Sequence, residues 1–349
     1  MNFRNNFPAV RGIQANREYY VAMIPLGLLE KIFIDNNETP LANYRAQRRI
    51  NELRIPEIKK YILENRDTYV FSALSASIDG EFEFKPYNNG DIGELSVDMN
   101  AVYLINDGQH RKAAILAAIK EDESLKNETI SIVFFKDIGL ERSQQMFTDL
   151  NKYAVKPSNS LATLYDSRDE VAIITKKVID SVEFFNRYTD KEKDNLGKNS
   201  SKLFTLNNLY KANQRIIKNN FVEDTENFIV NYWTHVSENI IEWQEVMNNK
   251  LYKKDLREDY IVTLAVTLNA FGRLGNYFYE NKNLNMYEYL KKLQNINWNR
   301  DDKTWYKRTI REDGRVKNTE EAIILTCNAI KKKLNIDLQK DEKLKEKHI

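Results

Sequence analysis

The stretch Asp107-Gly108-Gln109-His110-Arg111 places several groups suited to anion chemistry in one turn. Gly108 permits a tight turn and a close backbone approach. Gln109 and His110 can donate hydrogen bonds, and Arg111 can hold a phosphate through two parallel hydrogen bonds. A buried helix with an ordinary cap and a solvated arginine would need fewer of these residue types. The turn therefore predicts an anion site, with the capped helix as the alternative.

The elements on either side of this turn would position it. Residues 102–107 read as a strand, and residues 109–120 read as an almost wholly apolar helix. The start of that helix offers unpaired N–H groups and the positive end of its dipole to an anion. Asp107 could cap the helix or hold a metal. The sequence therefore predicts a strand, a turn and a helix that bind a phosphate.

The same turn could also catalyse hydrolysis of a nucleotide. Asp107, His110 and Arg111 are then the catalytic candidates, with Arg111 stabilising charge on the transferred phosphoryl group. Asp107 and Asp149 are the candidate ligands of Mg²⁺. Binding without hydrolysis remains the alternative interpretation.

The sequence DGQHRKAAI resembles the signature of the DGQHR-domain family, and its frame looks like the nucleotide-binding core of ParB and sulfiredoxin. In ParB-like domains a Gly-x-x-Arg-x-x-Ala turn opens a helix that holds a nucleotide's phosphates. Gly108, Arg111 and Ala114 match that spacing. The resemblance implies ATP or another NTP with Mg²⁺ as cofactor. It also implies nucleotide-binding roles for Gly108, Gln109 and Arg111, and for a loop that contains Gln47 and Arg48.

The next part of the ParB-like pattern is matched only in part. That pattern expects Glu-Asn-x-x-Arg at the end of a helix, where it helps to bind phosphates or a metal. Here Asp149 and Asn151 are the counterparts, but a leucine separates them and no arginine follows at the right distance. Lys152 or Lys156 could substitute for it. Because the pattern is incomplete, it leaves open which nucleobase is preferred and whether the nucleotide is hydrolysed. The alternative to a ligand site here is a polar helix end that runs into a loop.

Three later segments are similar to DNA sulfur modification proteins, a family within the DGQHR-domain group. They are FTDLNKYAVKPSNSLATLYDSRD, SSKLFTLNNLYKA and the block from NINWNRDDKTWYKR to KKKLNI. This family acts with the genes for DNA phosphorothioation, in which sulfur replaces a backbone oxygen. The resemblance implies a DNA-binding regulator of that modification and defence system, usually a transcriptional repressor. A DNA-coupled NTPase and a scaffold that recruits the other sulfur modification proteins remain alternatives.

Two local clusters of basic residues fit contact with double-stranded DNA. The first lies between Leu41 and Lys60, where Arg45 and Arg49 are the candidate contacts. The second lies between Asn299 and Lys317 and also contains aromatic residues. Its candidate contacts are Lys303, Trp305, Lys307, Arg308, Arg311 and Arg315. Cations interleaved with aromatics suit phosphate contact with stacking or wedge insertion, whereas a solvated surface is the alternative.

The order of the elements predicts two domains. The first ~150 residues alternate strands with helices, and from Pro157 the pattern is mainly helical and rich in aromatics. We therefore expect an α/β (α+β) core resembling ParB and sulfiredoxin in residues 1–156. A mainly α-helical domain is expected in residues 157–349. The expected strands are residues 17–25, 68–80, 102–107 and 128–138 with a hairpin in residues 81–97, and the expected helices of the core are residues 26–35, 53–65, 109–120 and 139–155.

The composition restricts the class of protein. Lys and Arg number 53 against 51 Asp and Glu, so nucleic-acid binding would depend on local clusters. With one cysteine, Cys327, and three histidines, we expect no zinc, haem or iron–sulfur centre. No apolar run reaches the ~18 residues of a membrane span, which predicts a cytoplasmic protein. A homo-oligomer, such as a dimer on a palindromic operator, is the expected assembly.

Overall fold

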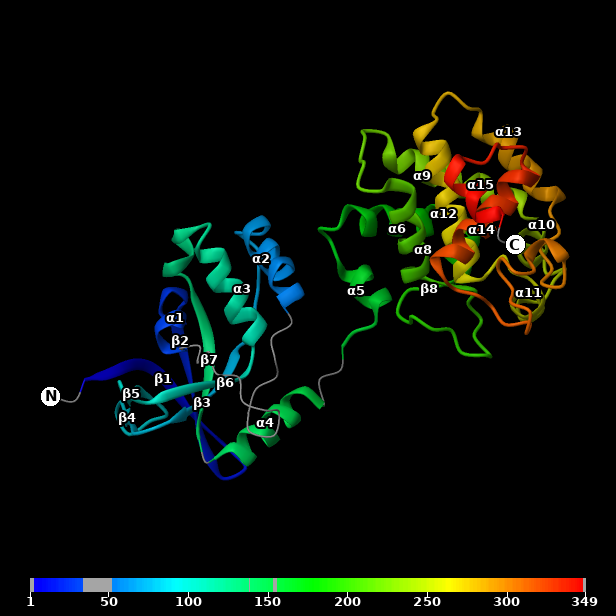
Figure 1. The fold of residues 1–349 in the computed structure, drawn as a ribbon. Helices are drawn as coiled ribbons and strands as arrows, with labels where there is room; N and C mark the ends of the chain where they lie inside the picture. Colours follow the sequence, from blue (N-terminus) through cyan, green and yellow to red (C-terminus); the bar gives the residue numbers. More distant parts are fainter. Residues whose placement is uncertain (1–2, 34–51, 138, 153–155, 348–349) are drawn as a thin grey trace. The chain divides into compact units, whose positions relative to one another are not determined.

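The computed structural model describes residues 3–33, 52–137, 139–152 and 156–347. The chain folds as two compact units, Met1–Val155 and Lys156–Ile349, which are called unit 1 and unit 2. In Figure 1 the chain can be traced by its colours from the strands of unit 1 to the helices of unit 2. The mixed α/β fold class is confirmed, because a seven-stranded sheet and many helices are both present.

Unit 1 is built on one seven-stranded mixed sheet with the order β4-β5-β1-β2-β7-β3-β6. Its neighbouring strands are antiparallel except for β3 and β7, which are parallel. The strands are β1 (Arg4–Gln14), β2 (Arg17–Pro25), β3 (Leu74–Asp79), β4 (Phe82–Pro86), β5 (Ile92–Asp98), β6 (Val102–Asp107) and β7 (Thr129–Lys136). The expected strands and hairpin are present, but the strand expected over residues 68–80 begins only at Leu74, and β1 is an additional strand that we did not expect.

In the described part of unit 1, the sheet is accompanied by the α-helices α1 (Leu29–Ile32), α2 (Ile55–Glu64), α3 (Gln109–Ile119) and α4 (Leu140–Lys152). Figure 1 shows α2 and α3 side by side. Buried aliphatic residues of α3, among them Ile115 and Ala118, share a core with alternate residues of the strands, such as Leu74 and Ala76 in β3. Helix α4 lies against β6 instead, where Met146 Sδ is 3.2 Å from Asn106 Nδ2. The end of β6 therefore leads directly into α3, and α4, which follows β7 in the chain, also contacts β6.

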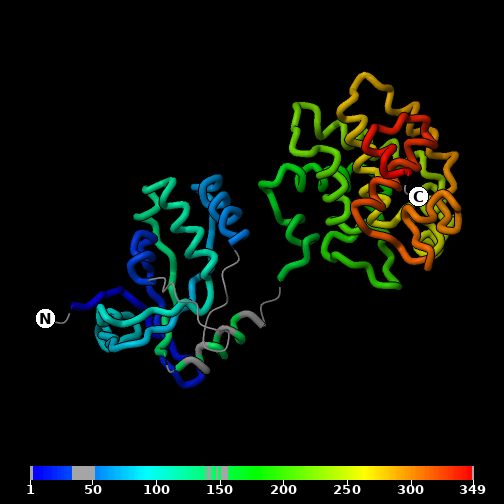
Figure 2. Tube along the Cα trace, in the orientation of Figure 1, coloured from blue at the N-terminus to red at the C-terminus, as the bar shows by residue number. Residues whose placement is uncertain are grey.

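Unit 2 is mainly helical. Its helices are α5 (Asn159–Tyr165), α6 (Glu170–Ser181), α7 (Glu183–Tyr188), α8 (Leu206–Ile217), α9 (Thr225–Asn239), α10 (Ile241–Met247), α11 (Lys253–Asp259), α12 (Ala265–Glu280), α13 (Met286–Leu290), α14 (Glu320–Lys333) and α15 (Lys340–Glu346). Two short strands, β8 (Thr189–Asp190) and β9 (Phe204–Thr205), form a parallel pair. Helix α12 runs through the middle of the unit and contacts α8, α9 and α14 (Figure 2).

Aromatic side chains fill the core of unit 2. Phe184 and Phe185 are almost fully buried, and the Phe184 ring stacks on Trp243 at 4.7 Å between ring centroids. All three rings belong to the core of this unit. Cys327 is also fully buried, and burial raises the pKa of its thiol to about 11, so it carries little thiolate at neutral pH.

Candidate functional site

The turn between β6 and α3 has a backbone that only glycine adopts easily. Gly108 is the N-cap residue of α3, with φ 104° and ψ 14°. A Cβ atom at this position would lie 2.3 Å from Leu74 Cδ2 and 3.3 Å from Arg111 Nη2. Among the described residues, no side chain caps the start of the helix. The first N–H groups of α3 are therefore not used by a capping side chain, which is the arrangement expected of an anion-binding helix start.

Arg111 is held by acceptors of the protein itself. Its Nη1 donates to the carbonyl and hydroxyl oxygens of Ser72 at 2.5 and 2.6 Å, and to the Ala73 carbonyl at 2.9 Å. Its Nη2 donates to Asp107 Oδ2 at 2.5 Å, and the Arg111 side chain is only 16% exposed. This differs from the expected two-bonded grip on a phosphate. The guanidinium instead ties the start of α3 to the segment before β3 and leaves only its remaining N–H groups for a ligand.

Gln109 is the residue of the turn with an unused buried group. Gln109 is 9% exposed, and its side-chain Nε2 has no hydrogen-bond acceptor among the described residues. An unmade hydrogen bond of this kind costs free energy, and it is rare in proteins unless a water or a ligand supplies the acceptor. His110 is half-buried beside it in the first turn of α3. The Nε2 group of Gln109 is therefore the donor best placed to donate a hydrogen bond to a ligand's oxygen.

Sequence reasoning missed three buried polar residues near this turn. Lys112 is 5% exposed and donates from Nζ to the Phe33 carbonyl at 3.0 Å. Ser75 Oγ and Asn106 Oδ1 are buried without a hydrogen-bond partner in the described structure. Ser75 lies opposite Asp107 in the β3–β6 pair. An amphipathic pattern does not reveal such residues, because lysine, serine and asparagine at these positions look like solvent-facing residues.

The candidate metal ligands are placed on two separate elements. Asp107 ends β6, its side chain is 41% exposed, and one oxygen is already paired with Arg111. Asp149 is an exposed residue of α4 that accepts from Gln145 Nε2 at 2.7 Å. The described part of the chain contains no group of three or more histidine, cysteine or acidic side chains that could hold a metal ion. The side chain of Asn151 and the residues Arg45, Gln47, Arg48 and Arg49 lie outside the described residues.

The candidate DNA contacts near the C-terminus are split between surface and interior. Lys303, Lys307, Arg311 and Arg315 are exposed. Arg311 and Arg315 flank a tight turn at Gly314, in which the Arg311 N–H donates to the Arg315 carbonyl at 2.9 Å. Acidic neighbours reduce the local charge, because Lys307 lies 3.3 Å from Glu312 and Arg315 lies 3.8 Å from Asp313.

Two members of the same set point into unit 2 rather than outwards. Trp305 is fully buried and stacks on Trp298, with 5.3 Å between ring centroids. Its ring faces are covered, which removes Trp305 from the residues that could stack on a base or wedge into DNA. The Arg308 side chain is 17% exposed and pairs with Glu346 at 2.9 Å. Arg308 therefore anchors α15, and the basic residues left on the surface are those named above.

Replacing Gly108 with alanine is expected to lower the free energy of unfolding of unit 1 by about 2 kcal/mol, because alanine is strained at this φ. Gly139 is a matched comparison, since its φ is 112° but a Cβ there meets nothing within 4 Å. Gly108→Ala should lower the free energy of unfolding by more than Gly139→Ala does, because only the methyl group at position 108 would clash with Leu74. Urea unfolding followed by circular dichroism measures both. A Gly108→Ala protein as stable as the unchanged chain would contradict this account of the turn.

Comparison with models of protein families gives a match. The family model DndB, described as DNA-sulfur modification-associated, matches residues 7–337 of the chain. Neither a curated protein nor a solved structure matches it. Within the described residues, no helix is both long and apolar enough to span a bilayer. The family match covers both units, so it applies to the turn at Gly108 and to the helical unit alike.

Proposed function

Because the chain belongs to the DndB family of DNA-sulfur modification-associated proteins, we propose that it is a DNA-binding regulator of DNA phosphorothioation. In this proposal it represses transcription of the modification genes, and a nucleotide bound at the Gly108–Arg111 turn changes its affinity for DNA. Membership in the family implies involvement in DNA sulfur modification. The regulatory role, the nucleotide and the DNA contacts are our proposals.

The nucleotide site rests on one observation above all, the unpartnered buried amide of Gln109 at an uncapped helix start. A phosphate at this place would accept from the first N–H groups of α3 and from Gln109 Nε2. Arg111 would position the turn through Ser72 and Asp107 and would add its remaining N–H groups. The strand, glycine turn and helix support a core that folds like those of ParB and sulfiredoxin. We propose ATP or another NTP with Mg²⁺ as the ligand, the metal being held by Asp107 and Asp149.

The Gln109→Met substitution tests this site without disturbing the fold. Methionine has a similar volume and no donor, so the free energy of unfolding should stay the same or rise by about 1 kcal/mol, because a buried unsatisfied group is removed. ATP affinity, measured by calorimetry with Mg²⁺, should fall roughly tenfold or more, since a hydrogen bond to a charged phosphate is lost. Gln14→Met, the same change at an exposed position of β1, is the control.

A result in which Gln109→Met lowers the free energy of unfolding but leaves the ATP affinity of the folded protein intact would make Gln109 a structural residue. It would also remove the main support for a nucleotide at this turn. Loss of ATP affinity in the Gln14→Met control would show that the assay responds to something other than the site.

Hydrolysis of the nucleotide is the second candidate function. It is favoured by the half-exposed Asp107 carboxylate beside the Arg111 guanidinium, since a metal-binding acid and a cation that stabilises phosphoryl charge are needed together. His110 would then be the candidate proton acceptor. Phosphate release from ATP with Mg²⁺, with and without duplex DNA, separates the two functions. Release above the level of a His110→Ala variant supports an NTPase, and no release leaves a regulator that binds without turnover.

Most of the proposed DNA contacts of the regulator belong to unit 2, and two belong to unit 1. The exposed Lys303, Lys307, Arg311 and Arg315 would contact backbone phosphates, which makes binding depend strongly on salt. Arg45 and Arg49 are also proposed to contact backbone phosphates of DNA. Other DNA sulfur modification proteins and a second copy of the chain are proposed partners, because a repressor dimer suits a palindromic operator.

A further inference from the structure

A polar cavity lies within unit 2, at a place that the sequence did not single out. It has a volume of about 750 Å³ and is formed by α8, α12 and the segment that starts α14. These three elements lie next to one another in the unit (Figure 1). Its walls carry four cationic side chains and one carboxylate. The cations are Lys211, Arg215, Lys218 and Arg273, and the acid is Glu320.

Close packing of two helices explains why these cations gather. A Cβ atom on Gly272 of α12 would lie only 2.5 Å from the Ala212 carbonyl oxygen of α8. The absence of a side chain at Gly272 therefore lets the two helix backbones approach. Arg215 of α8 then reaches α12, where its Nε donates to Asn269 Oδ1 at 2.8 Å. Arg273, one turn further along α12, lines the same cavity.

One of these cations already forms an ion pair with a carboxylate of the cavity wall. Arg215 donates through Nη1 and Nη2 to the two oxygens of Glu320, at 2.8 and 2.7 Å. The hydrogen bonds from Arg215 lower the pKa of Glu320, so this carboxylate is charged at neutral pH. The remaining cations keep donors for a ligand, although Lys218 lies 3.8 Å from Glu280 and Arg273 Nη2 lies 3.7 Å from Glu342. Lys211 and Lys218 are exposed at the rim, and Arg273 Nε is buried with no acceptor among the described residues.

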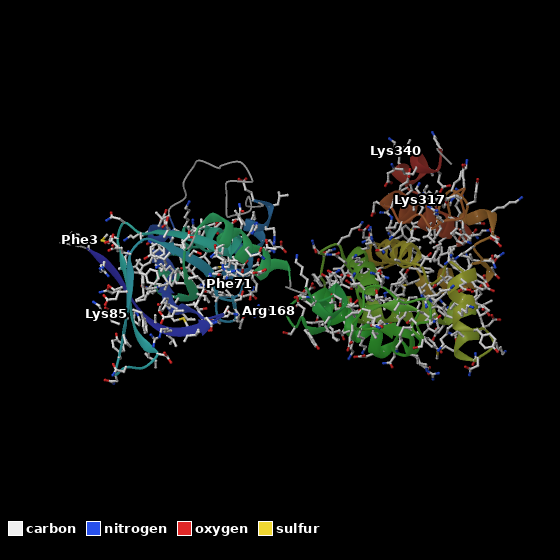
Figure 3. The ribbon with its side chains drawn as sticks, turned by 90° about the horizontal axis from the view of Figure 1, so that it is seen from below. Phe3, Phe71, Lys85, Arg168, Lys317 and Lys340 are labelled. Carbon is white, nitrogen blue, oxygen red and sulfur yellow. The ribbon has the colours of Figure 1, made fainter. Side chains whose placement is uncertain are left out.

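The composition of the walls selects phosphate over a nucleobase. None of the lining residues is aromatic, and only Ala265 and Ile323 are apolar. A base needs a ring or an apolar wall to stack on, whereas a backbone phosphate needs only cations and N–H donors. The cavity also continues the basic C-terminal block along the chain. Lys317, labelled in Figure 3, directly precedes Asn318 and Thr319, which line the cavity.

We propose that this cavity holds backbone phosphates of duplex DNA, with Lys211, Lys218 and Arg273 as the donors and Glu320 as an internal competitor. The inference rests on the proposed DNA-binding function and locates part of the DNA contact in this cavity. The cavity is polar and its rim lysines are exposed, so a phosphate can enter without a rearrangement of the helices. Glu320 limits the attraction until a phosphate replaces it on Arg215.

Two variants with opposite expected effects on DNA affinity test the proposal in the full chain. Lys211→Gln combined with Lys218→Asn removes two rim cations, and asparagine is chosen because Lys218 has a positive φ of 48°. Affinity for a labelled duplex, followed by fluorescence anisotropy, should fall on the order of tenfold, with a salt dependence shallower by about two contacts. Glu320→Gln removes the competitor and should tighten binding severalfold. Lys250→Gln with Lys254→Gln is the control of equal charge, on exposed residues outside the cavity.

The outcomes separate this inference from the function it rests on. If the unchanged chain fails to bind duplex DNA at low salt, both are overturned. If it binds DNA and the rim variant binds as well as the control, the cavity is not a DNA site and the proposed function stands. Stabilisation by tripolyphosphate, measured by thermal unfolding, covers the other source of phosphate. A rim variant that loses this stabilisation while keeping DNA affinity would make the cavity a site for a free phosphate ligand and overturn the proposal.

Discussion

Arg111→Ala is expected to lower the free energy of unfolding of unit 1 by roughly 2–4 kcal/mol and to abolish ATP binding at the same turn. The loss of stability follows from the contacts of the guanidinium, which donates to Ser72, Ala73 and Asp107 from a side chain that is 16% exposed. The loss of ATP follows because the turn at Gly108 is no longer fixed against the segment before β3.

Spectroscopy can separate the two units in this measurement. The four tryptophans, Trp233, Trp243, Trp298 and Trp305, all belong to unit 2. Urea unfolding followed by tryptophan fluorescence should therefore be unchanged in Arg111→Ala, while the transition seen by circular dichroism shifts to lower urea. Arg17→Ala, at an exposed position of β2, is the matched control and should change stability by no more than about 0.5 kcal/mol.

The opposite pattern would restore the simpler interpretation of Arg111 as a phosphate ligand. If Arg111→Ala is as stable as Arg17→Ala and still loses ATP, its hydrogen bonds to Ser72 and Asp107 contribute little. If it loses stability but binds ATP normally, the arginine has only a structural role. Arg111→Lys should not rescue either property fully, because an ammonium group cannot donate to Ser72 and Asp107 in the planar geometry of a guanidinium.

The largest effect on stability is expected in unit 2, from Glu342→Ala. Glu342 is 1% exposed, its Oε1 lies 2.6 Å from Lys331 Nζ, and Lys331 is 3% exposed. Removal of the carboxylate leaves the ammonium group buried without its partner, which costs about 3–5 kcal/mol. It also removes the bond from the Gln339 N–H to Glu342 Oε2 that starts α15. Urea unfolding followed by tryptophan fluorescence measures the change.

A double variant shows whether the pair or the packing is responsible. Lys331→Met with Glu342→Leu replaces both charges by apolar groups of similar size and should recover most of the lost stability, because no buried charge remains. Lys333→Ala, an exposed lysine on the same helix, is the control. A Glu342→Ala protein within about 1 kcal/mol of the unchanged chain would mean that water solvates the Lys331 ammonium group, even though Arg273, whose Nη2 is 3.7 Å from Glu342, loses the same carboxylate.

The local parts of the fold could be predicted because their signals are local. Strand β2 and the segment from β6 through Gly108 into α3 follow the residue pattern closely, and the need for glycine at position 108 is confirmed by its φ of 104°. Strand β1 was missed since Arg4, Asn5 and Pro8 disguise the alternation, in which Phe7 and Ala9 point into the core. The position of β7 between β2 and β3 also has no local signal.

The chemistry of the site was harder to predict than its location. The residues of the turn show that Arg111 is near a helix start, but its acceptors Ser72 and Ala73 lie far earlier in the chain. The basic run near Trp305 suggested a DNA surface, whereas the indole is buried by a stack on Trp298 that composition does not reveal. The cavity of unit 2 combines cations from α8 and α12, which only the packing at Gly272 brings together.

One titration tests the central claim, that a nucleotide at the Gly108 turn controls DNA binding by the same chain. The affinity for duplex DNA from the promoter of the modification genes is measured with and without ATP and Mg²⁺, for the unchanged chain and for Gln109→Met. We expect ATP to change DNA affinity by about fivefold or more in the unchanged chain, as coupled sites do, and not in Gln109→Met. An unchanged chain that does not bind DNA, or whose DNA affinity is the same with and without ATP, would contradict the account.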